Sequence, residues 1–157
     1  MKTFIITIFL VAGAGLLLLI MLAALSRSGK PPGLVAGRLL TCPDKPNCVT
    51  TEQGSDTGHY LAPVTLRETA GPHTLTTIRD VIVDIGGVIQ AQQGEYMAAS
   101  FSSPLFGFVD DFEIRVDQGE GLIHVRSASR VGYGDAGVNR KRVELFRKRY
   151  AETAAGE

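Results

Sequence analysis

An uncharged apolar run near the N-terminus constrains this chain more than any other feature. From Phe4 to Leu25 no residue is charged, and a helix of that length crosses a bilayer. A secretory signal has a shorter apolar region, and the best cleavage pattern here, Ala24-Leu25-Ser26, is mediocre. Residues 1–26 are therefore expected to form a transmembrane anchor or an uncleaved signal, and a cleaved signal remains the alternative.

The two cysteines of the chain stand close together, in Cys42-Pro-Asp-Lys-Pro-Asn-Cys48. The prolines favour a tight turn that brings the thiols together as a disulfide, and such bonds persist in oxidising compartments. Two unlinked thiols are the alternative, and a metal site is disfavoured because only His59 offers a further ligand. Positive charges flank the apolar run on both sides, so the cysteines decide the orientation. We expect a single-pass protein of the inner (cytoplasmic) membrane, with its domain facing the periplasm or exterior.

Beyond the anchor, the chain is expected to form one soluble domain. Pro31-Pro32 favours extended backbone and indicates a linker over residues 27–38. The domain then covers residues 39–151, and residues 152–157 form a disordered tail.

Apolar spacing predicts the elements of this domain. We expect helices over residues 75–85 and 136–151, the second capped by Asp135, and strands over 88–92, 96–102, 108–117 and 122–131. Short connections make neighbouring strands antiparallel. The predicted fold is α+β, a four-stranded antiparallel sheet flanked by two helices and preceded by one transmembrane helix. The second face of the sheet is expected to be free for solvent, a ligand or a partner.

Charged residues interrupt these strands in a regular way. In the strand over 108–117, alternation places Asp110 on the same face as the core residues and Glu113 on the opposite face. In the next strand it places Ser129 on the core face and Arg126 on the opposite face. A hairpin turning over residues 118–121 then sets Glu113 beside Arg126 and Asp110 beside Ser129. His124 falls on the outer face and is expected to be solvated.

The closing helix carries polar residues within its apolar arc, namely Asn139, Arg142 and Arg149. A buried guanidinium needs an acidic partner, and residues 80–120 are as rich in acids as residues 126–149 are in bases. We expect Asp110 to pair with Arg142 or Arg130 inside the protein. Alternatively, several arginines face a pocket and hold a carboxylate or phosphate group.

Three motifs carry a family resemblance. They are Cys42-Pro-Asp-Lys-Pro-Asn-Cys-Val49, then Asp56-Thr-Gly-His59 with Pro63, and a polar set made of Asp110, Asp111, Glu113, Arg126, Ser127, Ser129, Arg130, Asp135, Asn139, Arg140 and Arg142. In these motifs residues 40–149 resemble the domain-of-unknown-function 1499 family. The resemblance implies a small envelope or organelle-lumen protein, and it implies no catalytic residues.

These observations predict a membrane-anchored envelope protein that is not an enzyme and binds a protein partner or a small anionic ligand. The candidate ligand-binding or polar-network residues are His59, Asp110, Asp111, Glu113, Arg126, Ser127, Ser129, Arg130, Asn139, Arg140 and Arg142. We expect no metal, cofactor or nucleic acid, since Gly132-Tyr-Gly-Asp-Ala-Gly137 lacks the βαβ unit of a dinucleotide site and the basic residues are balanced by acids. Two alternatives remain: a cell-envelope hydrolase using His59 with Asp110 and Ser127 or Ser129, and an accessory subunit of a membrane complex.

Overall fold

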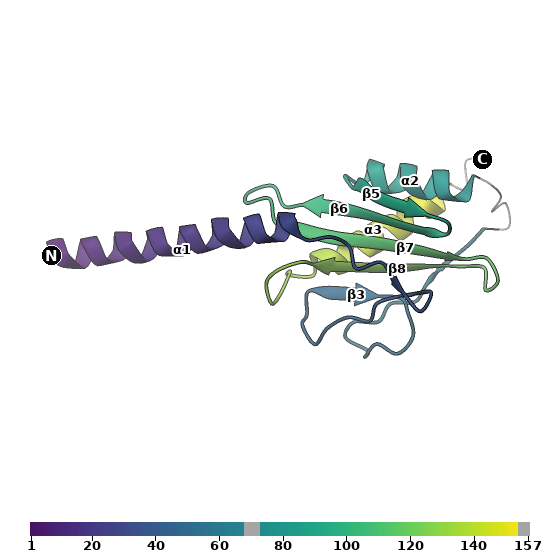
Figure 1. Ribbon diagram of the computed structural model, residues 1–157, viewed down its shortest axis with the longest axis horizontal. Helices are drawn as coiled ribbons and strands as arrows, with labels where there is room; N and C mark the ends of the chain where they lie inside the picture. Colours follow the sequence, from purple (N-terminus) through teal and green to yellow (C-terminus); the bar gives the residue numbers. More distant parts are fainter. Residues whose placement is uncertain (68–72, 154–157) are drawn as a thin grey trace.

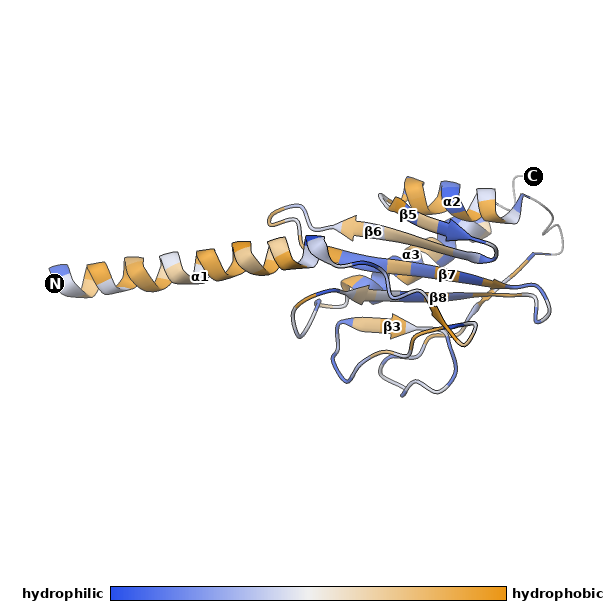
Figure 2. Ribbon diagram, viewed as in Figure 1, coloured by the Kyte–Doolittle hydropathy of each residue, from blue (hydrophilic) through white to orange (hydrophobic). Residues whose placement is uncertain are grey.

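A long helix projects from one end of a layered α+β domain in the computed structural model, which describes residues 1–67 and 73–153 (Figure 1). This helix, α1, is Lys2–Ser28, and it is hydrophobic along most of its length (Figure 2). Most of its apolar side chains are exposed. It is long and apolar enough to cross a membrane. The chain thus has the single N-terminal apolar helix that its sequence predicts.

The domain is built on a six-stranded antiparallel sheet. The strands lie in the order β3 (Cys48–Thr50), β8 (Leu122–Ser129), β7 (Val109–Asp117), β6 (Tyr96–Ser102) and β5 (Val88–Gln93), while β4 (Val64–Thr65) also pairs with β8. The prediction of a four-stranded sheet was therefore wrong in number, although all four predicted strands exist. Of the added strands, β4 lies within residues 63–67, which the sequence indicates as a candidate short strand, whereas β3 has only three residues, too few for alternation to reveal it.

Two helices, α2 (Thr74–Asp84) and α3 (Val138–Thr153), cover one face of this sheet (Figure 1). The packing between α3 and the sheet includes Phe112 of β7 and Phe146 of α3. Both side chains are fully buried, and their ring centroids are 5.4 Å apart. Burying such a side chain contributes about 1.5–3 kcal/mol. A disordered tail was expected over residues 152–157, but residues 152 and 153 belong to α3. Residues 154–157 lie outside the described residues.

The start of α3 confirms the predicted cap. Ala136 and Gly137 have positive φ angles of 53° and 76°, so the helix begins at Val138 rather than at Ala136. The Asp135 carboxylate accepts hydrogen bonds from the backbone N–H of Gly137 at 2.9 Å and of Asn139 at 2.7 Å. It thereby satisfies donors that the first helical turn leaves unpaired.

The second face of the sheet is crossed by the segment expected to be a linker. A small hairpin of β1 (Leu34–Val35) and β2 (Arg38–Leu39) lies there, and Leu39 is buried with Tyr96 and Ala98 of β6. The expectation that this face is free was wrong for this part of the sheet. The hairpin turn uses left-handed residues at Ala36 and Gly37, with φ angles of 51° and 76°. Alanine is an unusual choice for such a turn, so the sequence did not reveal the hairpin.

The C-terminal end of α1 is fixed to the domain beside the first residue of β7. The Ser26 hydroxyl accepts a hydrogen bond from the Val109 N–H at 3.1 Å, and its carbonyl accepts one from Arg130 at 3.0 Å. The Arg27 guanidinium donates to the Gly107 carbonyl at 3.2 Å. Gly107 has a φ angle of 67°, and a Cβ there would collide with Arg27. The helix therefore does not end in a flexible tether.

Candidate functional site

An inner network of polar side chains lies between the sheet and α3; we define it as Asp110, Ser127, Ser129, Asn139 and Arg142. Arg142 donates to the Asp110 carboxylate at 2.8 Å and to the Asn139 side-chain carbonyl at 2.6 Å. The Ser127 hydroxyl donates to the same carbonyl at 2.6 Å, and the Asn139 amide donates to the Ser129 hydroxyl at 3.1 Å. The predicted pairing of Asp110 with Arg142 is confirmed, as is the register that sets Asp110 opposite Ser129.

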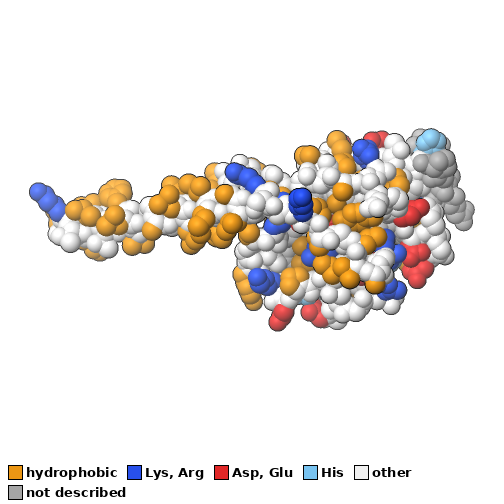
Figure 3. Space-filling model, in the orientation of Figure 1, with side chains coloured by type: hydrophobic (Ala, Val, Ile, Leu, Met, Phe, Trp, Pro, Cys, Tyr) orange, Lys and Arg blue, Asp and Glu red, His pale blue; other side chains and the backbone are white. Residues whose placement is uncertain are grey.

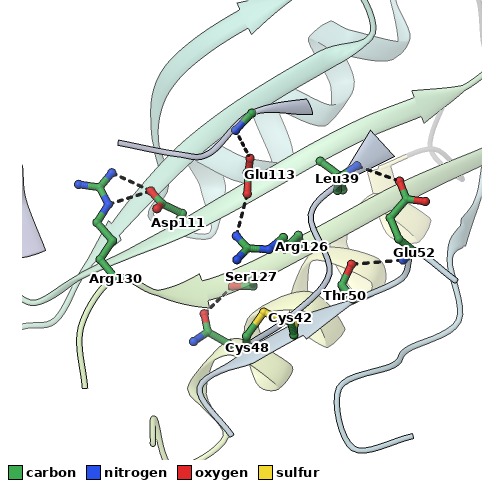
Figure 4. A network of polar contacts seen from close by, with 12 residues as sticks. Leu39, Cys42, Cys48, Thr50, Glu52, Asp111, Glu113, Arg126, Ser127 and Arg130 are labelled. Carbon is green, nitrogen blue, oxygen red and sulfur yellow. Dashed lines mark hydrogen bonds and ion pairs between the residues drawn. A yellow bond between two sulfur atoms is a disulfide. The ribbon is translucent and has the colours of Figure 1, made fainter. Parts of the chain in front are cut away.

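An outer network occupies the opposite face of the sheet, under the segment that carries β1 and β2 (Figure 4). It comprises Tyr96, Asp111, Glu113, Arg126 and Arg130. The fully buried Glu113 carboxylate accepts hydrogen bonds from Arg126 at 2.9 Å and from the Tyr96 hydroxyl at 2.8 Å. Arg130 donates twice to one oxygen of Asp111, at 2.9 and 2.7 Å. The predicted neighbours Glu113 and Arg126 face each other across β7 and β8.

Burial dominates the electrostatics of the outer network. It raises the pKa of the Glu113 carboxyl above its usual range, even though Arg126, the Tyr96 hydroxyl and the Gly33 N–H all stabilise the charged form. Burial, followed by the charge of Glu113, also raises the pKa of the Tyr96 phenol. Tyr96 therefore remains a hydrogen-bond donor at physiological pH. The network holds the hairpin segment down, since the Gly33 N–H donates to Glu113 at 3.0 Å.

Glu52 is a buried acid that the sequence did not reveal. Its side chain accepts hydrogen bonds from Arg115 at 2.8 Å and from the Leu39 N–H at 3.2 Å. Burial alone would raise the pKa of the Glu52 carboxyl, but these donors and the nearby His124 outweigh it and lower that pKa below its usual value. Glu52 follows a three-residue strand within a polar loop, so no periodicity indicated its burial.

His124 is buried, which corrects the expectation that it is solvated. It does lie on the outer face as predicted, but that face is covered. Its Nδ1 is 3.7 Å from Glu52, and its Nε2 is 3.8 Å from Glu120. Ligand atoms of Asp117, Glu120 and His124 lie within 4.8 Å of one another, so these described residues could hold a metal ion. Arg115 opposes this, because its guanidinium already binds Asp117 at 2.8 Å.

A pocket of about 380 Å³ opens where three sequence motifs meet, and we call it the motif pocket. Its lining comes from three segments: residues 44–49, residues 56–59 and residues 133–140. His59 Nδ1 contacts the Cys48 carbonyl at 2.9 Å, and Arg140 donates to the Gly58 carbonyl at 2.8 Å. The predicted disulfide between Cys42 and Cys48 is present and closes the first segment.

Asn47 connects the motif pocket to the inner network, a role that its place between the cysteines did not reveal. Its buried side-chain amide donates to the Gly132 carbonyl at 2.9 Å. Its backbone carbonyl accepts hydrogen bonds from the Ser129 N–H at 2.9 Å and from the Asn139 amide at 3.0 Å. The Pro-Asn-Cys part of the first motif was the only signal for this residue.

The predicted site residues thus fall into three groups. Asp110, Ser127, Ser129, Asn139 and Arg142 form the inner network, Asp111, Glu113, Arg126 and Arg130 belong to the outer network, and His59 and Arg140 line the motif pocket. Within the described residues, no contact joins His59 to Asp110, Ser127 or Ser129. His59 Nε2 instead lies 3.6 Å from Asp56, and fully buried Ser127 is bonded to Asn139.

No curated protein matches the chain. A family model described as "Protein of unknown function (DUF1499)" matches residues 38–149, which include all three motif segments, the two networks and most of the domain. Since the match covers well over half of the chain, as the motifs indicated, the chain belongs to the DUF1499 family.

Proposed function

We propose that this protein is a single-pass protein of the inner membrane whose outward-facing domain binds a small anionic ligand in the motif pocket. The length and apolar character of α1 support the anchor. The disulfide supports an oxidising compartment on the side of the domain. An alkaline phosphatase fused after the last residue should be active in intact cells. An inactive fusion that is fully expressed would contradict the orientation.

The cations of the motif pocket carry the ligand proposal. The guanidiniums of Arg126, Arg130 and Arg142 are bound to acids of the two networks, so they are not available to a ligand. In the pocket, Arg140 makes one hydrogen bond among the residues that the structure describes, to the neutral Gly58 carbonyl, and retains further donors. Lys45 is exposed at the rim, and within the described residues its ammonium has no hydrogen bond or ion pair.

Three acids line the pocket: Asp56 and Asp135 are engaged by backbone donors, and Asp44 is exposed. Asp56 accepts hydrogen bonds from the N–H groups of Gly58 and His59, at 2.8 and 3.2 Å. Asp135 is similarly bound to the N–H groups at the start of α3. These donors partly offset the charges of Asp56 and Asp135, so the remaining donors of Lys45 and Arg140 are available to a carboxylate or phosphate group. Among the described residues, His59 has no hydrogen bond or ion pair with Asp110, Ser127 or Ser129, which favours a binding domain over the hydrolase alternative.

The binding proposal is tested by thermal unfolding of the full chain in detergent with inorganic phosphate, sulfate or succinate added. A ligand at one hundred times its Kd stabilises the folded state by about 2.7 kcal/mol, which raises Tm by several degrees. We expect Arg140→Gln with Lys45→Gln to abolish this rise. Lys141→Gln, an exposed neighbour on α3, is the matched control and should retain it. A rise that is equal in all variants, or absent for every anion in the native chain, would contradict the proposal.

A further inference from the structure

The membrane-facing end of the domain carries apolar side chains that the fold leaves exposed. Two loops lie there, on either side of the end of α1 in the view of Figure 1: residues 103–108 between β6 and β7, and residues 130–137 between β8 and α3. Leu105 is 82% exposed, Tyr133 is 72% exposed and Val138 is 45% exposed. Exposed apolar groups gathered at one end of a domain indicate contact with another apolar surface.

A groove runs between these loops and the helix. Its volume is about 330 Å³, and its apolar walls include Leu19 and Leu22 of α1 together with Phe108, Val131 and Val138. The loops therefore reach back along α1 toward its middle. Figure 3 shows apolar side chains along α1 up to the point where it enters the domain, with basic side chains at that junction.

The depth of this groove in a membrane follows from the helix. The apolar run from Phe4 to Leu25 is about 33 Å long as a helix, close to the roughly 30 Å hydrocarbon core of a bilayer. Leu25 then lies near the boundary of the core, and Leu22 and Leu19 lie about 4.5 and 9 Å deeper. The loops that share a groove with these two leucines are thus level with lipid acyl chains.

The charge distribution is compatible with that depth. Residues 103–109 and 131–134 contain no charged side chain. The two acids that line the groove are both bound, Asp110 by Arg142 and Asp135 by backbone N–H groups, so immersion leaves neither without a partner. Exposed Arg27 and Lys30 follow directly after the apolar run, where they can meet lipid headgroups.

We infer that this end of the domain is immersed in the leaflet on its own side of the membrane, with a phospholipid acyl chain filling the groove beside α1. The inference rests on the proposed anchor. The domain would then sit on the bilayer, with the loop 103–108 and Tyr133 in the interface. Aromatic side chains such as Tyr133 favour that zone because one end of the ring is apolar and the other is polar.

Single-tryptophan variants test the inference, since the chain has no tryptophan of its own. Leu105→Trp and Tyr133→Trp place the reporter in the proposed contact. Gln118→Trp is the matched control, because this exposed residue follows β7 at the far end of a nine-residue strand, about 30 Å away. Each full-length variant is reconstituted in phosphatidylcholine vesicles, with circular dichroism to confirm folding. Its emission is quenched by bromine on the acyl chains or by acrylamide in the water.

We expect brominated chains to quench tryptophan at positions 105 and 133 at least about threefold more than at position 118, since only the former lie within reach of the lipid. Acrylamide should show the reverse order. If the protein stays with vesicles after an alkaline wash but acrylamide quenches all three positions alike, the immersion is wrong and the anchor stands. Release by the wash would overturn both. Protection from both quenchers would show that a second copy covers the loops, which also overturns the inference.

Discussion

At the scale of single residues, Asn139 holds three separate segments together. It is fully buried, and its side chain accepts from Ser127 and Arg142 while donating to the Asn47 carbonyl and the Ser129 hydroxyl. One amide thus joins β8, α3 and the disulfide loop. A buried polar group whose hydrogen bonds are all made is compatible with a stable fold. Removing one partner leaves the other buried and unsatisfied, which lowers the free energy of unfolding.

Replacing Asn139 by alanine should therefore be severe. The change leaves buried donors and acceptors on several partners unsatisfied, and we expect it to lower the free energy of unfolding by about 3 kcal/mol. Chemical or thermal unfolding of the full chain in detergent measures the loss. Lys141→Ala, exposed on the same helix, should change stability by no more than about 0.5 kcal/mol. Equal losses in the two variants would show that the inner network does not stabilise the fold.

Glu52 gives a dependence on pH. Its folded-state pKa is lowered, so its ionised form stabilises the protein above the unfolded value of about 4.3, and that contribution disappears as pH falls through the folded pKa. We expect native protein to exceed Glu52→Gln in unfolding free energy by a constant amount from pH 7 to about pH 5, with the gap closing below about pH 4. Glu95→Gln, in the exposed turn between β5 and β6, is the control. A gap that widens in acid would refute this reading of Glu52.

At the scale of elements, periodicity was sufficient where a segment was long. The strands β5 to β8 and the helices α2 and α3 were all predicted within a few residues, and the pairing of Glu113 with Arg126 followed from alternation alone. Short elements were harder to predict: β4 lies inside residues 63–67, a candidate short strand in the sequence, but β1, β2 and β3, with two or three residues each, were missed. Their pairing depends on contacts with a sheet that is distant in sequence. For the same reason, the burial of Glu52 and His124 could not be predicted.

The loop that leads into β3 depends on the disulfide. Cys42 and Cys48 are six positions apart, and closing so short a loop stabilises the protein by about 2 kcal/mol in the loop-entropy model. Dithiothreitol should lower the unfolding free energy of the native protein by about that amount. It should leave the Cys42→Ser, Cys48→Ser double variant unchanged. If reductant has no effect on the native protein either, the bridge does not stabilise this loop.

At the scale of the whole molecule, the docking of α1 determines how the domain is oriented relative to this helix. Ser26, Arg27 and Arg130 join the end of the helix to the first residues of β7 and the loop before it. Gly107 leaves the space that Arg27 occupies. A side chain there meets the end of the Arg27 guanidinium, so it should displace Arg27 from the Gly107 carbonyl while the Ser26 contacts with Val109 and Arg130 remain.

Gly107→Ala tests this docking against Gly94→Ala. Both glycines have positive φ angles, 67° and 53°, so each change should cost about 1–2 kcal/mol of backbone strain. Only at Gly107 does the new Cβ meet Arg27, whereas the space around Gly94 is open. We expect trypsin to cleave after Arg27 much faster in Gly107→Ala, measured by mass spectrometry in lipid vesicles. Cleavage at the same rate in both variants would mean that Arg27 is not held by the domain.

The rigid junction at Ser26 also has a mechanical consequence. When a helix is joined to its domain by a flexible linker, the helix can tilt without moving the domain. Here the contacts of Ser26 with Val109 and Arg130 couple a tilt of α1 to the sheet. Bilayers of different thickness impose different tilts on a spanning helix. If α1 spans a bilayer, a thinner membrane would therefore tilt the whole domain together with the helix.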